Sequence, residues 1–297
     1  MSANAANLYG KQYANSVALL LQQKGSRFEG AVTTGQYQGS QASPVDQIGA
    51  VEMQQVTTRF GAIGRVDAAL SRRWVNPTDW DLPQLMDSFD ELKILSNPKS
   101  KYVLNAIYAA GRKKDDLIID AFFGNASTGV DGSTSTSFAT DGGNTVAVDE
   151  AASAANNMTV AKLRRARRYL LAAEVDMEMD SLHGAMNAQA DDSLLQEAQV
   201  VSTDFNERPV LVDGKIVKFL GFQFIHSERL DTDGNSYRQC PFWAKSGMHS
   251  GMWTDMQTDI SQRKDLSGLP WQAYLKISLG ATRLEGAKVV EVLCSET

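Results

Sequence analysis

The sequence predicts a mixed fold of the α+β class, and three observations carry this prediction. A stretch rich in Gln, Thr and Arg, from Gly25 to about Trp80, has the composition of extended chain rather than helix. A strong helical pattern spans Asn97 to Phe123, and from Val175 onward the pattern turns to strands. An extended segment too polar to build its own core has to be covered by something else. The order of segments therefore suggests a subunit whose surface is completed by its neighbours.

Composition narrows the class further. The chain has 297 residues, 43% of them hydrophobic, which is enough for one large domain or two smaller ones. A formal net charge of -6 opposes a protein that coats nucleic acid, because such proteins carry basic stripes. Cys240 and Cys294 fit neither a disulfide framework nor a metal-binding spacing, so we expect two reduced thiols. The chain lacks a signal-peptide layout and any apolar run of about 18 residues, so we expect a soluble, non-exported protein.

The first predicted element is an amphipathic helix from about Ala6 to Lys24, ended by Gly25. Its apolar face is formed by residues at spacings of four and three: Tyr9, Tyr13, Val17 and Leu20. A lone N-terminal helix needs a partner. We therefore expect this face to dock on a neighbouring subunit.

The next segment predicts a long two-stranded ribbon. From Arg27 to Val75, β-type runs alternate with Gly, Ser and Pro: FEGAVTT, AVEMQQVTTRF and ALSRRWV. An isolated ribbon is marginal in water. Two interpretations stay open, an edge hairpin on its own domain and a ribbon that reaches a neighbouring subunit. No lysine occurs from Gly25 to Leu92, and the region carries arginines instead: Arg27, Arg59, Arg65, Arg72 and Arg73.

The clearest helix begins at Asn97-Pro98 and ends before Gly124. Its apolar stripe consists of Val103, Ile107, Ala110 or Gly111, Ile118, and Ala121 or Phe122. We expect the charged run from Arg112 to Asp116 to be a solvated or interface turn held by local pairs. A loop rich in Gly, Ser and Thr is predicted from Gly124 to Gly143.

A second helix is predicted from its cap at Thr159 through Leu171. Its buried side is expected to hold Val160, Leu163, Ala166 and Leu170. The remaining surface carries Arg164, Arg165, Arg167 and Arg168. A solvated face paired with carboxylates is favoured here over a contact with nucleic acid, because the chain is acidic.

The strand-rich part contains a strong hairpin signal. Strands from Pro209 to Val212 and from Lys215 to Phe219 flank Asp213-Gly214, which accepts the positive φ angles of a tight turn. Phe222 and Phe224 continue the alternation. The final strands are predicted as Tyr274 to Gly280 and Lys288 to Cys294, and the second of these looks largely buried.

Catalytic and metal-binding patterns are not found, so we predict no enzyme, no cofactor and no metal site. The chain has three histidines, His183, His226 and His249, and none of them is part of an HExxH motif. GxSxG and phosphate-loop motifs do not occur either. Asp231 to Asn235 is favoured as a solvent turn over a calcium loop, because its Gly comes too early. Four aspartates lie close together in the sequence: Asp79, Asp81, Asp87 and Asp90. We interpret them as an acidic surface at the start of a helix rather than as a cation site.

Several segments, in order, resemble major capsid proteins of tailed bacteriophages with the Hong Kong 97-like fold. The first is DLIIDAFFGNASTGVDGS at 116–133, preceded by GRKKD, and it looks like the end of the family's spine helix and the following loop. The others are MTVAKLRRARRYL at 158–170, AMNAQADDSLL at 185–195, GKIVKFLGFQFIHSERL at 214–230 and LKISLGATRLEGAKVVEVLC at 275–294. The resemblance covers most of the chain.

The resemblance implies a division into an N-terminal arm (1–25), an extended E-loop (26–80), a P domain (81–171) with spine helix 97–123, an A domain (172–262) and return strands (263–297). It implies a shell protein that self-assembles into hexamers and pentamers, encloses double-stranded DNA without sequence-specific binding, makes no membrane contact, and locates to the virion after assembly in the host cytoplasm. A separate decoration or scaffolding protein is a further candidate partner. The alternative is an encapsulin-like shell of a bacterial cargo compartment.

The expected assembly interface combines the arm face with the ribbon arginines and a tryptophan: Tyr9, Tyr13, Val17, Leu20, Arg27, Arg59, Arg72, Arg73 and Trp74. Some members of the fold join subunits by an isopeptide bond from an E-loop lysine. Because this chain has arginine there, and a guanidinium is a poor nucleophile, the expected lock is non-covalent.

Overall fold

The computed structural model describes residues 22–55, 57–59, 63–86, 99–197, 211–212, 215–216 and 218–296. Its α-helices are α2 (Lys99–Phe123), α3 (Val160–Ala172) and α4 (Ala188–Leu195), and its 3-10 helices are η2 (Glu29–Ala31), η3 (Lys245–Gly247) and η4 (Gly286–Lys288). Its strands are β1 (Thr33–Gln36), β2 (Ala42–Ile48), β3 (Leu70–Val75), β4 (Thr78–Met86), β5 (Ala126–Thr128), β6 (Thr134–Thr136), β7 (Asn144–Val146), β8 (Leu182–Met186), β9 (Leu211–Val212), β10 (Lys215–Ile216), β11 (Lys218–Phe219), β12 (Phe222–His226), β13 (Arg238–Ala244), β14 (Met248–Gln262), β15 (Trp271–Arg283) and β16 (Val289–Cys294). The mixed helix and sheet class is confirmed.

The described residues fall into two compact units. The first takes its residues from Met1–Ser26, Asp79–Lys113 and Thr254–Ser278, and the second from Arg27–Thr78, Lys114–Trp253 and Leu279–Thr297. The sheets have the strand orders β1-β14-β15-β4, β11-β12-β8-β13-β16-β7, β2-β3-β5-β6 and β10-β9. The pairing of β9 with β10 confirms the predicted hairpin, while its turn residues lie outside the described part. The prediction of one strand from Lys215 to Phe219 is wrong, because Lys218 and Phe219 form β11, which pairs with β12 in the six-stranded sheet.

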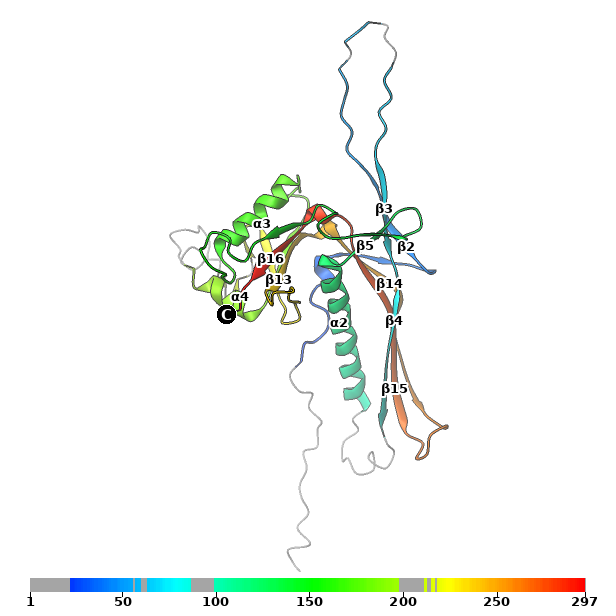
Figure 1. Ribbon diagram of the computed structural model, residues 1–297. Helices are drawn as coiled ribbons and strands as arrows, with labels where there is room; N and C mark the ends of the chain where they lie inside the picture. The colour runs from blue at the N-terminus through cyan, green and yellow to red at the C-terminus, as the bar shows by residue number, and fades with distance from the viewer. Residues whose placement is uncertain are drawn as a thin grey trace, which may run out of the picture. The chain divides into compact units, whose positions relative to one another are not determined.

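The second unit is built around the six-stranded sheet, against which α3 packs (Figure 1). Strand β8 is buried at every position and β13 from Cys240 onward, which explains their nearly continuous apolar sequence. The Trp243 ring lies 4.5 Å from Phe122 and 5.9 Å from Phe28, and its Nε1 donates to the Ala31 carbonyl at 2.8 Å. This aromatic cluster joins α2 and η2 to the sheet.

Helix α3 confirms the prediction for this segment. The Thr159 side chain accepts a hydrogen bond from the Lys162 amide, and the predicted apolar face is buried: Val160, Leu163, Ala166 and Leu170. Arg165 lies 3.9 Å from a Glu150 oxygen and 5.0 Å from the Tyr169 ring centre. The prediction left Lys162 out of the buried set, yet its side chain is fully buried within the sheet side of the helix.

The predicted ribbon is present, but it contains fewer strand residues than expected. The prediction that FEGAVTT belongs to it is wrong, because this run forms η2 and the start of β1, which pairs with β14. Strands β2 and β3 pair antiparallel, with Ile48 opposite Leu70, and the Gly49 amide donates to the Ala69 carbonyl at 2.7 Å. The described residues between them, 49–55, 57–59 and 63–69, extend as the two sides of a narrow loop (Figure 1). The prediction that AVEMQQVTTRF is a strand is wrong for its described residues 50–55 and 57–59, because no paired strand holds them.

Three further expectations need correction. The run from Gly124 to Gly143 is more than a loop, because β5 and β6 form a hairpin that extends the β2-β3 sheet. The charged turn of α2 is partly buried: Lys114 is 7% exposed and Asp115 is 0% exposed. The Asp115 carboxylate accepts backbone amides of Arg27 at 2.9 Å and Phe28 at 3.3 Å, so it holds the start of η2.

In the first unit, Asp79 and Asp81 lie on strand β4, so the expected helix start is wrong for them, and Asp87 and Asp90 lie outside the described residues. Residues 22–24 are not helical, and the rest of the predicted N-terminal helix lies outside the described part. Gln22 and the Gln23 carbonyl instead accept hydrogen bonds from Arg112, at 2.7 and 3.2 Å. Among the described residues, no helix combines the length and apolar character needed to span a bilayer.

Candidate functional site

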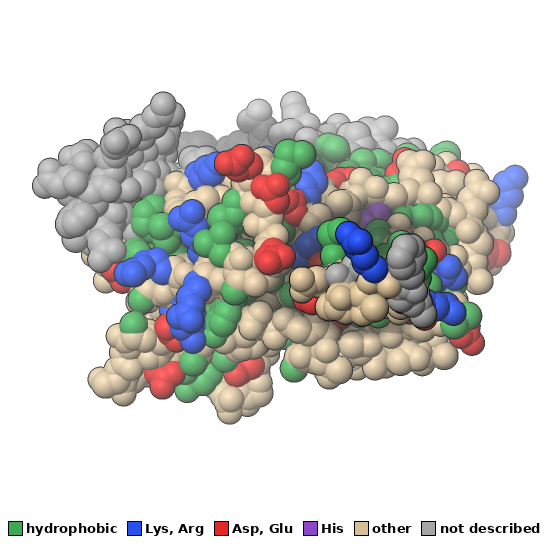
Figure 2. Space-filling view, turned by 90° about the horizontal axis from the view of Figure 1, so that it is seen from above, with side chains coloured by type: hydrophobic (Ala, Val, Ile, Leu, Met, Phe, Trp, Pro, Cys, Tyr) green, Lys and Arg blue, Asp and Glu red, His purple; other side chains and the backbone are tan. Residues whose placement is uncertain are grey.

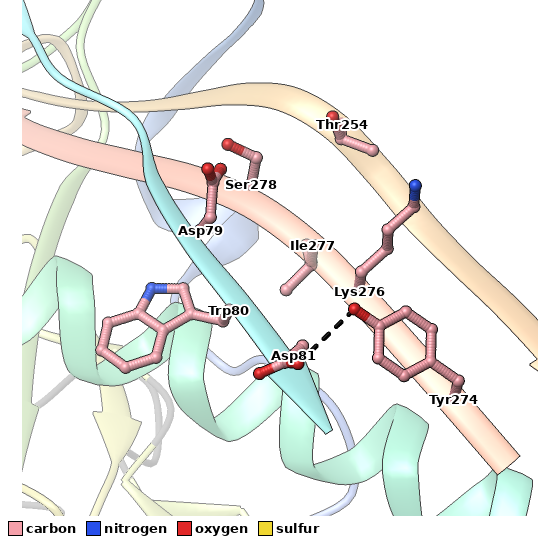
Figure 3. Close-up of a pocket in the computed structure, with 8 residues that line it drawn as sticks. All are labelled: Asp79, Trp80, Asp81, Thr254, Tyr274, Lys276, Ile277 and Ser278. Carbon is pink, nitrogen blue, oxygen red and sulfur yellow. Dashed lines mark hydrogen bonds between the residues drawn. The ribbon is translucent and has the colours of Figure 1, made fainter. Parts of the chain in front are cut away.

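A pocket of about 440 Å³ lies in the first unit, among residues of β4, β14 and β15. Figure 3 shows side chains from β4, β14 and β15 around it: Asp79, Trp80, Asp81, Thr254, Tyr274, Lys276, Ile277 and Ser278. Side chains alternate between the faces of a strand, so Asp79 and Asp81 share one face of β4. The Tyr274 hydroxyl donates to Asp81 Oδ2 at 3.5 Å.

Two carboxylates line this pocket. Asp79 and Asp81 are both exposed, and Asp79 has no hydrogen bond or ion pair within the part of the chain that the structure describes. Beside it, Lys113 Nζ lies 3.9 Å from the centre of the Trp80 ring, a cation–π contact on the flank of the pocket. An exposed carboxylate without a partner can receive a cationic side chain.

The base of the ribbon carries an exposed cluster on β2 and β3. Arg72 donates to both carboxylate oxygens of Asp46, at 2.5 and 2.9 Å, and its guanidinium lies 5.6 Å from the Trp74 ring centre. The hydrogen bond from Arg72 lowers the pKa of Asp46. Trp74 Nε1 donates to the Gly129 carbonyl at 2.8 Å, which holds the β5–β6 hairpin against β3.

A second, buried cluster lies directly beside the first. The Asp141 carboxylate is shared by Arg73 and by Arg283, whose Nε lies 3.0 Å from Asp141 Oδ2. Arg73 Nε also donates to the Leu284 carbonyl at 2.7 Å. Arg283 Nη1 donates to the carbonyls of Phe122 and Gly124, at 2.8 and 2.9 Å, and so satisfies the end of α2.

The burial of this Arg73–Asp141–Arg283 cluster is close to complete. The side chains are 9%, 5% and 0% exposed in that order. Burial lowers the pKa of Arg283. The cluster ties the base of the ribbon to the end of α2 and to the loop before β7, so it is a structural joint.

Two histidines are buried and one ends a strand. His226 is the last residue of β12. Burial lowers the pKa of His183 and of His249. The Thr33 hydroxyl donates to the Met248 carbonyl at 2.6 Å and lies 2.9 Å from His249 Nδ1, so Nδ1 carries the proton and donates to Thr33.

The other nitrogen of His249 then accepts from the Tyr37 hydroxyl at 2.8 Å. A neutral ring therefore links Thr33 on β1 and Tyr37, the residue after β1, to β14. This bridge is structural, because both ring nitrogens are already used within the chain. Among the described residues, no group of His, Cys, Asp and Glu has the arrangement of a metal site.

The residues predicted for the assembly interface fall into three groups: some lie outside the described part, some are exposed, and some contact other residues of the chain. The arm residues lie outside the described part: Tyr9, Tyr13, Val17 and Leu20. Arg59 is exposed and has no interaction within the described residues, whereas Arg27 donates its side chain to the His226 carbonyl. Arg72 and Trp74 sit on the exposed ribbon base, while Arg73 turns inward to Asp141. Of the predicted residues, the structure thus brings the side chains of Arg72 and Trp74 together.

Sequence reasoning missed Asp141, Arg283 and the pocket. Asp141 lies 68 residues from Arg73 and 142 from Arg283, so no local spacing links them. The only sequence feature that could have indicated the buried cluster is an arginine placed next to apolar strand residues. Arginine is common on strands, so this feature does not identify a partner.

Comparison with known proteins places the chain in a family. The model of a family described as "Phage capsid protein" matches residues 5–296. Comparison with curated protein sequences finds no match. Among solved structures, the capsid of cyanophage Pam1 is 12% identical with a TM-score of 0.75, and covers 97% of each chain.

Two other solved capsids share the fold. The capsid of a native GTA particle is 10% identical with a TM-score of 0.73, covering 99% of this chain and 97% of that one. The capsid of Ralstonia phage GP4 is 10% identical with a TM-score of 0.72, covering 98% and 96%. At such identities these likenesses show the fold, while the family model extends over nearly the whole chain.

The family is one of structural proteins, and the alternative of a cargo compartment is not favoured, because the family model and the similar structures are of phage capsids. The resemblance found in the sequence is therefore confirmed. This chain belongs to the phage capsid protein family.

Proposed function

We propose that the protein is the main subunit of an icosahedral phage head shell. In this proposal α2 is the spine helix of a P domain at 81–171, preceded by an arm (1–25) and an E-loop (26–80), and followed by an A domain (172–262) and return strands (263–297). The subunits form hexamers and pentamers that enclose double-stranded DNA. The shell is assembled in the host cytoplasm and becomes part of the virion.

The observation that carries the proposal is the apolar surface of the ribbon. Large apolar side chains lie open to solvent on its described residues, and the most exposed are Ile48 at 72%, Met53 at 101%, Ile63 at 99% and Leu70 at 78%. Soluble proteins that act alone rarely present apolar side chains in such a series. A narrow ribbon cannot cover its own two faces, so other copies of the chain are the natural cover.

Charge supports enclosure of DNA rather than tight binding. The net charge is -6, and Figure 2 shows Lys and Arg side chains interspersed with Asp and Glu on the face seen from above. A lining that gripped DNA would need a basic stripe and would make affinity strongly dependent on salt. A mixed surface leaves the DNA free to be packed and released.

The pocket in the first unit supplies an acceptor for a ribbon arginine of a neighbouring subunit. Arg59 and Asp79 are both exposed, carry opposite charge, and have no partner within the described part of the chain. A guanidinium can bind a carboxylate through two hydrogen bonds, which fixes direction as well as contact. We therefore assign the Arg59–Asp79 pair to the contact between subunits.

The test of shell formation compares two matched pairs of substitutions by electron microscopy of the expressed protein. Met53→Ser with Ile63→Ser removes apolar surface from the ribbon, and Met179→Ser with Val130→Ser removes similarly exposed apolar surface elsewhere. We expect the ribbon pair to lower the yield of closed shells at least about tenfold, because several exposed apolar side chains lose their cover. Equal yields from the two pairs would contradict the proposal.

The same assay tests the arm and the charge pair. Deletion of residues 1–24 should leave soluble subunits and few closed shells. Arg59→Asp and Asp79→Arg should each lower the yield, and the two together should restore it, whereas Asp259→Arg on the same unit serves as the control. If the double variant stays defective while the wild-type protein forms shells, the Arg59–Asp79 assignment is wrong and the shell proposal stands.

The contents of purified particles test the enclosed cargo. Phage DNA inside particles made during infection is the expected result. A folded enzyme in place of DNA would instead indicate a cargo compartment.

A further inference from the structure

The two cysteines, far apart in sequence, are neighbours in the fold. Cys240 lies on β13 and Cys294 is the last residue of β16, and these strands pair antiparallel with Cys240 opposite Val292. Cys294 is two residues beyond Val292, so both thiols project from the same face of the sheet. Both side chains are fully buried.

A buried lysine completes this group. Lys162 extends from α3 and donates from Nζ to the carbonyls of Asn156 at 2.7 Å and Leu293 at 2.8 Å. An ammonium has three N–H donors, so these two carbonyls do not exhaust it. Its positive charge lies beside the strand end that carries Cys294, in a region without solvent.

The two thiols differ in their readiness to ionise. The neighbouring Cys240 thiol, and then the charge of Lys162, lower the pKa of Cys294. The neighbouring Cys294 and burial raise the pKa of Cys240 well above its ordinary value. Cys294 therefore ionises more readily than Cys240, and the thiolate is the form that reacts with a peroxide.

We propose that Cys240 and Cys294 form a redox pair that closes to an intrachain disulfide when the protein meets a peroxide. The Cys294 thiolate attacks one peroxide oxygen, the O–O bond breaks, and the released hydroxide takes a proton to become water. The resulting sulfenic acid is attacked by the Cys240 sulfur, which gives up its proton as the S–S bond forms and a second water leaves. In sum, two thiols and one hydrogen peroxide give one disulfide and two waters.

The strand geometry requires a small movement before the disulfide can form. Diagonal neighbours on paired strands have Cα atoms about 7–8 Å apart, whereas a disulfide needs at most about 6.8 Å. The strand end at Cys294 must therefore move inward by roughly 1 Å. This small shift is easiest at the last residue of a strand, where pairing continues on one side only.

The disulfide would tie β16 to the centre of the six-stranded sheet. Cytoplasmic thiols are kept reduced, whereas thiols outside the cell are not. This timing rests on the proposed function: in a phage shell subunit, the bond would form after particles leave the host. The chemistry itself belongs to the single chain, so its test does not require a shell.

The test treats the full-length, unassembled protein with hydrogen peroxide and follows it by intact mass and peptide mapping. The expected product has lost two hydrogen atoms and yields a peptide in which Cys240 is joined to Cys294. Its thermal midpoint should rise by on the order of 5 to 10 °C, because the cross-link restricts the unfolded chain. A reductant should reverse both changes.

Variants separate the roles of the three residues. Cys240→Ser and Cys294→Ser should each abolish the linked peptide, while a Lys162→Met variant should still form it, with the pH profile of the rate shifted to higher pH. Two outcomes on the wild-type protein would overturn the proposal: oxidation of a single cysteine to sulfinic acid with the other thiol free, or both thiols remaining free. An unshifted pH profile in Lys162→Met would remove the lysine from the proposal.

Discussion

Replacing Asp141 with Asn removes the carboxylate that two buried guanidiniums share. Arg73 is 9% exposed and Arg283 is 0% exposed at the side chain, and Asp141 itself is 5% exposed. Arg283 Nη2 already has no hydrogen-bond partner among the described residues. Without the carboxylate, two positive charges would be buried side by side, with only backbone carbonyls to face them.

The magnitude follows from the burial. Removing one partner of a buried ion pair typically costs about 3–5 kcal/mol, because the remaining charge is left without compensation. We therefore expect the free energy of unfolding of the Asp141→Asn subunit to fall by about that amount. The joint between the ribbon base and the end of α2 should loosen at the same time, since Arg73 and Arg283 lose the group that holds them together.

The assay is urea unfolding of dissociated subunits, followed by tryptophan fluorescence. Asp46→Asn is the matched control, because it breaks the Arg72–Asp46 pair on the neighbouring residue of β3, where both side chains are exposed. An exposed ion pair contributes little, so this control should leave the urea midpoint almost unchanged. Equal midpoints for the two variants would refute the argument from burial.

The other predictions use the core, the histidines and the ribbon. Phe122→Ala should lower the free energy of unfolding by about 3–5 kcal/mol in the same assay, because it opens a cavity beside Trp243, while Val130→Ala at an exposed site should change it little. Burial depresses the pKa of His249 below its ordinary 6.5. The contribution of the neutral ring to the free energy of unfolding is therefore complete above pH 6.5 and is lost as the pH falls through the folded pKa. Thermal midpoints measured between pH 7 and 5 should fall accordingly, and the fall should be smaller in His249→Gln. Shells boiled in detergent should release monomers of 32.4 kDa, because no lysine lies between Gly25 and Leu92 to form an isopeptide bond, and a ladder of covalent oligomers would contradict this.

Local pattern was enough for the elements whose signal lies within a few residues. Thr159 capped α3 as expected, because the cap depends on a side chain and an amide three residues away. The tight turn signal at Asp213-Gly214 predicted the pairing of β9 with β10 for the same reason. The segments that carried the family resemblance were also local, and the family model confirms the resemblance across residues 5–296.

Predictions made from composition were wrong where contacts with distant segments decide whether a residue is buried or paired. The charged run of α2 looked solvated, yet Asp115 is fully buried because the backbone amides of Arg27 and Phe28, some 87 residues earlier, need an acceptor there. The Gly, Ser and Thr residues after Gly124 looked like a loop, yet the open edge of β3 gives them a partner to pair with. These hydrogen-bond partners come from distant segments of the folded chain, so the local spacing of residues does not predict them.

The sequence by itself determined the class of the fold, the main helices and the final strands, and a ribbon that carries arginine in place of lysine, because periodicity and side-chain chemistry are written along the chain. Only the tertiary structure decided which charges are buried and which are free. It turned Arg73 inward to Asp141, left Arg59 and Asp79 exposed, and placed Cys240 against Cys294. The physical reason is that desolvation and pairing depend on neighbours brought together from distant parts of the chain.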